Sequence, residues 1–178
     1  GKDTFANFLY AELFTHERYL IVSFADAVKE LCIDLFDLNY DQVHGDKKEV
    51  KDFRFAKTKY GYWTPREIMQ EIGETIRKID HLYWVRKFEE KIGKETNVII
   101  PAVRHIVEAG YVVRKEGILL RIDRTERDEI HRPDDSSETG LDKWEGWDEI
   151  ITNDGSLEDL NNKAKKVAKR VIIATSTS

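Results

Sequence analysis

The chain has 178 residues, of which 40% are hydrophobic, and this length is typical of one domain with a real core. Charged residues make up 35% of the sequence and the net charge is −5, which disfavours a dedicated nucleic-acid-binding protein because such proteins usually carry a basic face. The apolar runs at 98–100 and 118–120 are too short to span a bilayer, and no basic-then-apolar leader opens the sequence. The single cysteine, Cys32, lies in an apolar helical stretch, so we expect a buried free thiol and a reducing, cytoplasmic environment.

Short β-branched runs alternate with longer helical periodicities, which predicts an α/β fold with a mainly parallel sheet and helices on both faces. In chain order we predict helix 4–14, strand 19–22, helix 25–36, a polar and aromatic insertion at 37–62, a helix from 64, helix 82–92, strand 97–100, helix 107–115, strand 118–122, a charged loop at 124–146, strand 149–151 and a helix from 156 towards 170. Residues 174–178 are typical of a frayed tail, and we treat 1–178 as a single domain.

Two helix starts are marked by their capping residues. Thr64, Pro65 and Glu67 provide an N-cap, a proline at the first helical position and the acid of a capping box. The turn signal at 152–155 precedes the last helix, whose start carries a similar pattern in Ser156 and Asp159. These boundaries are the sharpest that the sequence offers.

The sequence opens with Gly1-Lys2-Asp3-Thr4 and continues directly into a predicted helix. This order is typical of the second half of a Walker A loop, in which the lysine neutralises phosphate oxygens and the hydroxyl holds Mg²⁺. Lys2 is therefore a candidate for binding donor phosphates, and Asp3 and Thr4 are candidates for the metal shell, with a simple helix cap as the alternative. The full motif also needs a strand and an earlier glycine, so we expect about ten further residues ahead of Gly1.

The insertion carries a basic segment between Lys47 and Lys59, in which six cations are set against Glu49, Asp52 and the preceding Asp46. Such a segment is either a solvated connection or a basic lip that attracts a small anionic substrate.

Six segments, taken in order, resemble the bacteriophage deoxynucleoside monophosphate kinases over nearly the whole chain. They are residues 1–6, 25–30, 64–73 with 80–85, 99–104, 137–141 and 151–158. In that family an aspartate, here Asp3, replaces the first Ser/Thr of the P-loop, and an Arg-x-x-x-Gln-x-x-Gly helix matches Arg66, Gln70 and Gly73. No single segment decides the resemblance, but their shared order is specific.

The resemblance implies a P-loop NTPase fold with an adenylate-kinase-like lid at 124–146 and the insertion 37–62 on the substrate side. It implies transfer of phosphate from ATP, with Mg²⁺, to deoxynucleoside monophosphates in the cytoplasm, which is the host's cytoplasm for a phage protein. The expected partners are small nucleotides, without nucleic acid or membrane, and a homodimer is left open.

The resemblance also assigns roles to individual residues. The catalytic residues would be Lys2, Arg104 and Arg124. ATP would be bound by Gly1, Lys2, Asp3, Thr4, Arg124, Asn153 and Gly155, and Mg²⁺ by Asp3 and Thr4. The acceptor would be bound by Lys29, Arg66, Gln70 and Glu138. The side-chain chemistry supports Arg66 in particular, because an arginine in the first turn of a helix opposes the helix dipole yet can grip a phosphate bidentately.

One departure from the family leaves alternatives open. Ala102 stands where the family has an aspartate before Val103-Arg104, so a carboxylate beside the phosphates is missing. The chain is then either a full kinase or a catalytically weak nucleotide-binding module. A P-loop kinase for another small metabolite, of the phosphomevalonate or dephospho-coenzyme A type, is the other alternative, and a pure interaction protein ranks third.

Overall fold

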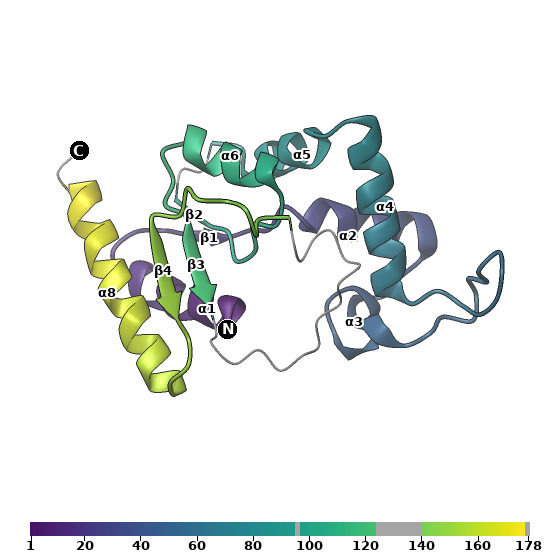
Figure 1. Ribbon diagram of the computed structural model, residues 1–178, viewed down its shortest axis with the longest axis horizontal. Helices are drawn as coiled ribbons and strands as arrows, with labels where there is room; N and C mark the ends of the chain where they lie inside the picture. Colours follow the sequence, from purple (N-terminus) through teal and green to yellow (C-terminus); the bar gives the residue numbers. More distant parts are fainter. Residues whose placement is uncertain (95–96, 124–139, 177–178) are drawn as a thin grey trace. The chain divides into compact units, whose positions relative to one another are not determined.

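The structure, a computed structural model, describes residues 1–94, 97–123 and 140–176, and the chain forms two compact units (Figure 1). Unit 1 comprises Gly1–Ser23 and Ile92–Ser178, and unit 2 is the continuous stretch Phe24–Lys91. Unit 2 is therefore inserted into the sequence of unit 1.

The strands of unit 1 form two parallel pairs. Strand β1 (Leu20–Ile21) pairs with β2 (Val98–Ile99), with Leu20 opposite Val98. Strand β3 (Leu120–Asp123) pairs with β4 (Glu149–Thr152), with Leu120 opposite Glu149. All four strands lie where the sequence predicts them, and the parallel pairing is confirmed, but the described residues form two separate two-stranded sheets rather than one.

The first and last helices of unit 1 pack against each other. Helices α1 (Lys2–Leu13) and α8 (Leu157–Ser176) share the main apolar cluster of this unit, to which Phe5 and Leu13 contribute from α1 and Ala164 from α8. The fully buried Ala164 has a side chain small enough to let the two helices approach closely. Helix α8 continues to Ser176, so the predicted frayed tail is wrong for 174–176; Val171 and Ile172 pack on the cluster and extend the helix.

An apolar groove of about 650 Å³ runs through unit 1. Its walls are residues 97–103, around β2, and 116–122, around β3, together with apolar side chains of α1 and α8 and Val112 of helix α6 (Ile106–Arg114). Within the described residues no strand pairs with β2 on its groove side or with β3 on its groove side. The groove therefore lies between the two strand pairs.

Unit 2 is mainly helical. Helices α2 (Asp26–Phe36), α4 (Pro65–Ile79) and α5 (Tyr83–Ile92) surround a core to which Val28, Cys32, Ile68 and Trp84 contribute. The indole N–H of Trp84 donates to the carbonyl of Gly73, at 3.0 Å, and so fixes α5 against α4. Cys32 is fully buried, as predicted, and burial raises the pKa of its thiol to about 11.

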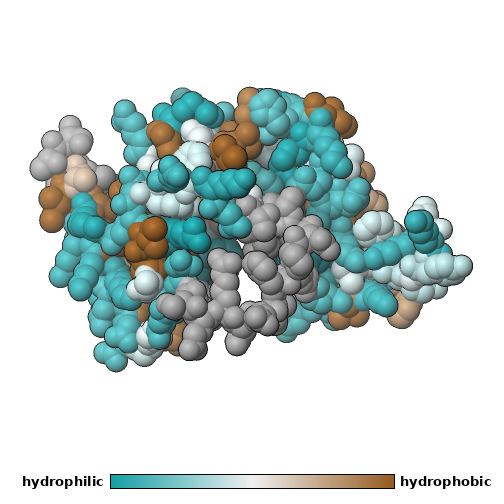
Figure 2. All heavy atoms as spheres, viewed as in Figure 1, coloured by the Kyte–Doolittle hydropathy of each residue, from teal (hydrophilic) through white to brown (hydrophobic). Residues whose placement is uncertain are grey.

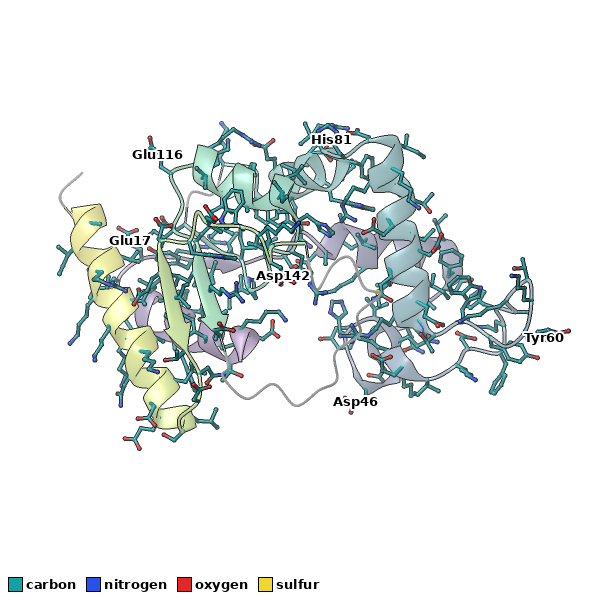
Figure 3. All side chains as sticks on the ribbon, viewed as in Figure 1. Glu17, Asp46, Tyr60, His81, Glu116 and Asp142 are labelled. Atoms are coloured by element: carbon teal, nitrogen blue, oxygen red, sulfur yellow. The ribbon has the colours of Figure 1, made fainter. Side chains whose placement is uncertain are left out.

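The insertion at 37–62 contains more order than its sequence pattern predicts. It forms helix α3 (Tyr40–Val43), a 3₁₀ helix η1 (Asp46–Glu49) and an arm, residues 53–62, that is closed by an antiparallel bridge between Ala56 and Tyr62. Gly61, with φ of 88°, turns the chain in a region that favours glycine. Tyr60 projects from the tip of the arm and is 94% exposed (Figure 3).

The buried carboxylate of Asp52 organises this insertion. It accepts hydrogen bonds from Gln42 Nε2 at 2.7 Å and from Arg54 Nη2 at 2.7 Å, while its own backbone N–H donates to the carbonyl of Trp63 at 2.8 Å. The Arg54 side chain contributes most to holding the pKa of Asp52 at about 2. Asp52 thus joins α3 and the base of the arm through its side chain, and the segment that enters α4 through its backbone.

The face of the molecule seen in Figure 2 is mostly hydrophilic, and its apolar side chains form small separate groups. In the part of the chain that the structure describes, none of the helices combines the length and hydropathy needed to cross a bilayer.

Candidate functional site

The N-terminal end of α1 presents the residues that the sequence assigned to phosphate binding. The helix begins at Lys2, with Gly1 as its N-cap, and the Phe5 N–H donates to the carbonyl of Gly1 at 2.9 Å. Lys2 and Asp3 are exposed and Thr4 is partly buried. The sequence placed Lys2 ahead of the helix; it lies instead in the first turn, where unpaired backbone N–H groups favour anions.

Gly1 lies directly against Asn153, just after β4. A Cβ atom at Gly1 would be 3.0 Å from Asn153 Nδ2 and 3.9 Å from Ile122 Cγ2, so a side chain here would press on its neighbours. Asn153 is buried, and its backbone N–H donates to the carbonyl of Asp123 at 2.6 Å. The structure thus brings two predicted nucleotide-binding residues together at the carboxyl ends of β3 and β4.

Gly155 has a local structural role. A Cβ atom there would lie 2.7 Å from Asp159 Oδ2. The same oxygen accepts the backbone N–H of Ser156 at 2.9 Å and its hydroxyl at 2.7 Å, which confirms the predicted cap of α8. Helix capping alone therefore accounts for a glycine at this position, and a contact with nucleotide stays a prediction.

Arg104 lies in the short segment between β2 and α6 and is partly buried. Its backbone N–H donates to Glu108 Oε2 at 2.8 Å. Arg104 thus follows the carboxyl end of a parallel strand, the edge at which open α/β sheets bind ligands.

Of the four acceptor residues predicted from sequence, Lys29, Arg66 and Gln70 lie in unit 2. Arg66 is in the first turn of α4, behind the confirmed capping box of Thr64 and Glu67, and its Nε donates to the Glu49 carboxylate of η1. Gln70 lies one helical turn further along α4 and is partly buried. Lys29 is not simply solvated, because its ammonium lies 3.3 Å from Asp26 Oδ1 on α2.

The predicted lid, 124–146, lies largely outside the described residues, and so do Arg124 and Glu138. Of the predicted lid, residues 140–146 are described, and there the backbone N–H of Trp144 donates to the carbonyl of Leu141 at 3.0 Å.

Two acids near this site were missed by the sequence reasoning. Asp123 ends β3, and its Oδ2 lies 3.8 Å from Arg121 Nε. Glu108 is 5% exposed and holds the segment that carries Arg104. An acid directly after an apolar run was a readable signal for Asp123. Glu108 is marked in the sequence only by its spacing from the helix start, which is a weak signal.

The residues around the start of α1 suit a phosphate group with a hard divalent cation. Lys2 supplies positive charge, the first turn supplies N–H donors, and Asp3 and Thr4 offer oxygen ligands of the kind that Mg²⁺ prefers. No group of three or more His, Cys, Asp or Glu side chains at metal-binding distance occurs among the described residues.

Comparison with known proteins places these features in one family. The sequence pattern of the deoxynucleotide monophosphate kinase family matches residues 37–164. A protein of Acanthamoeba polyphaga mimivirus, itself only provisionally named a deoxynucleotide monophosphate kinase, is 28% identical over 180 residues, which cover 90% of this chain and 86% of that protein. The deoxynucleotide monophosphate kinase of Escherichia phage RB69 is 30% identical over 116 residues, 60% of this chain and 46% of the phage enzyme.

Proposed function

The chain belongs to the deoxynucleotide monophosphate kinase family, whose members phosphorylate deoxynucleoside monophosphates, and we propose that its phosphoryl donor is ATP, held with Mg²⁺ at the start of α1. Nucleotides are accordingly its small-molecule substrates. Family membership sets aside the phosphomevalonate and dephospho-coenzyme A alternatives. The cytoplasmic location and the homodimer left open by the sequence stay predictions.

One observation carries the proposal for the donor site: Gly1 at the N-terminus of α1 is packed against Asn153 at the carboxyl ends of β3 and β4. A glycine there lets a phosphate approach the backbone, where the helix N-terminus favours negative charge. Asn153 borders the same place and supports the assignment of this edge to the nucleotide.

Phosphoryl transfer requires alignment of two nucleotides and positive charge around the moving group. Lys2 would neutralise oxygens of the donor phosphates, while Asp3 and Thr4 would hold Mg²⁺, which supplies further charge neutralisation when bound. Arg104 would stabilise charge on the transferred phosphoryl group from beyond β2. Arg124, on the strength of the family resemblance, would add charge from the lid.

We assign acceptor binding mainly to residues of unit 2. Arg66 would grip the phosphate of the deoxynucleoside monophosphate by exchanging its Glu49 partner for phosphate oxygens. Gln70 would hydrogen-bond the base, and Lys29 and Glu138 would complete the site in accordance with the family resemblance.

The P-loop NTPase fold is part of the same proposal. The groove in unit 1 is lined on both sides by strands whose groove-side edges pair with no other strand of the described residues, and it is mostly apolar in between, as the environment of a central parallel strand would be. A strand ahead of Gly1 would pair with β2 and β3 and join them into one sheet. It would also place the first half of a phosphate loop directly before α1.

Substitution of Lys2 by alanine tests the proposal. We expect Lys2→Ala to abolish phosphoryl transfer to every deoxynucleoside monophosphate without loss of the fold, because the exposed ammonium supports no core. Lys165→Ala is the matched control: that lysine is exposed on α8, where it lies 3.8 Å from Glu12. Initial rates by coupled ADP release, with circular dichroism for the fold, give the answer. Near-normal turnover by a folded Lys2→Ala variant would contradict the assignment of the donor site to the start of α1.

A further inference from the structure

The buried carboxylate of Glu108 holds the short segment that joins β2 to α6. Glu108 is the third residue of α6, and its Oε2 accepts the N–H of His105, the N-cap residue, at 3.2 Å. The same oxygen accepts the N–H of Arg104 at 2.8 Å. The shorter of the two bonds therefore reaches the residue ahead of the helix cap.

Two other helices show what an ordinary cap requires. Glu67 in α4 and Asp159 in α8 occupy equivalent positions, and each accepts the backbone N–H of the residue immediately before its helix. Glu67 is only partly buried and Asp159 is exposed, whereas Glu108 is 5% exposed. Burying a carboxylate is costly, so capping does not by itself call for the arrangement at Glu108.

We propose that Glu108 is a positioning residue for phosphoryl transfer, which acts by fixing the backbone of Arg104. Residues 100–105 form neither helix nor strand, so the regular hydrogen bonds of a helix or sheet do not hold the backbone of Arg104. The hydrogen bond to Glu108 ties the backbone of Arg104 to the first turn of α6. It thereby fixes the point from which the Arg104 side chain extends. Small displacements of a charge from a transferred phosphoryl group cost rate, because catalysis here depends on alignment. The inference rests on the proposed role of Arg104.

Glu108→Asp separates capping from positioning. An aspartate at this place of a helix caps it in the way that Asp159 caps α8, but its shorter side chain does not reach the Arg104 N–H. We expect kcat to fall at least ~10-fold, equivalent to about 1.4 kcal/mol, with little change in KM or in Tm. Glu108→Gln keeps the length and an accepting oxygen, so it should stay within about threefold of the parent protein.

A double-mutant cycle with Arg104→Ala tests whether Glu108 acts through Arg104. If it does, Glu108→Asp should cost less than about twofold in kcat/KM once Arg104 is absent. Should Glu108→Asp unfold, Glu108→Ala replaces it in the same cycle with the same criterion.

Asp148→Ala provides the structural control. Asp148 also holds a backbone N–H in unit 1, that of Leu119 at 2.7 Å, but at the amino end of β3. The Asp148→Ala substitution should lower Tm and leave kcat/KM unchanged. Equal losses from Glu108→Asp with and without Arg104, or an unchanged kcat, would overturn the inference while the proposed function stands. Near-normal activity of Arg104→Ala would instead remove the role of Arg104 and the premise with it.

Discussion

Ala102 lies between the end of β2 and Arg104, at the carboxyl edge where the phosphates are proposed to bind. A methyl group can hold neither Mg²⁺ nor a water, so the site should bind nucleotide well and align the acceptor poorly. We predict that Ala102→Asp raises kcat at least ~10-fold, a barrier change of about 1.4 kcal/mol. Initial rates with ATP, Mg²⁺ and each deoxynucleoside monophosphate measure the effect.

Ala102→Asn is the matched control for this gain. It adds nearly the same volume without the charge, so it should not raise kcat. An unchanged or lower rate in well-folded Ala102→Asp would mean that the carboxylate of this site comes from elsewhere, and Asp123 at the end of β3 would be the next residue to test.

Arg66 offers a second test at the scale of one side chain. Arg66→Lys keeps the charge but loses the planar fork, so we predict a loss on the order of 2 kcal/mol in monophosphate binding and a much smaller loss in ATP binding. Calorimetric titration with each ligand measures both. Arg77→Lys, on the same helix and paired with Glu74, is the control and should change neither affinity. Equal weakening of both ligands by Arg66→Lys would contradict an acceptor role.

At the scale of elements, the stability of the 37–62 insertion within unit 2 depends on Asp52. We predict that Asp52→Asn destabilises unit 2 by on the order of 2 kcal/mol at pH 7, because it removes a charged acceptor from Gln42 and Arg54. Urea unfolding, read by hydrogen exchange across 39–63, measures the loss. Asp46→Asn, an exposed acid in η1, is the control and should change stability little.

The pKa of Asp52 sets the pH range of this contribution. The folded pKa is about 2, below the ordinary value of 3.8, so the unfolded chain takes up the proton more readily. The stabilisation is therefore complete above about pH 4 and is lost as the pH falls from about 4 to about 2. Asp52→Asn should lack this part of the acid transition, and identical acid profiles of the two proteins would contradict the role of Asp52.

The predictions from sequence agree best with the structure where the interacting residues are close together in the chain. The capping box at Thr64 and Glu67 is present with both hydrogen bonds, at 3.2 and 2.9 Å, because its partners are three residues apart. Within 37–62 the local capping box of Asn39 and Gln42 was a readable signal that the sequence reading missed, whereas the bond from Gln42 to the buried Asp52, ten residues away, carried no local signal. The Arg66–Glu49 pair was missed for the same reason, since its partners are 17 residues apart.

At the scale of the whole molecule, alternation of short strands and helices predicted the four strands and their parallel pairing. It did not predict the division into two units, because periodicity carries no information on which helices share a core. The Walker A pattern at Gly1-Lys2 led us to expect a strand ahead of Gly1, which stays a prediction, and the sequence did not locate the groove in unit 1. Of the predicted site, Gly1 and Asn153 are adjacent. Arg104 follows the end of a strand, as predicted, whereas Lys2 was expected ahead of the helix and is instead its first residue.

The packing of α1 against α8 bears on how the protein is made. Unit 2 is continuous in sequence, so it can fold while the ribosome is still adding the later part of unit 1. Helix α1 emerges before unit 2 but finds its partner only after α8 is synthesised, and such long-range contacts form slowly. Until α8 is synthesised, the apolar face of α1 therefore lacks the helix that covers it in the folded protein. Premature termination within α8 would release a chain with a folded insert and an unfinished core, a natural substrate for chaperones and proteases.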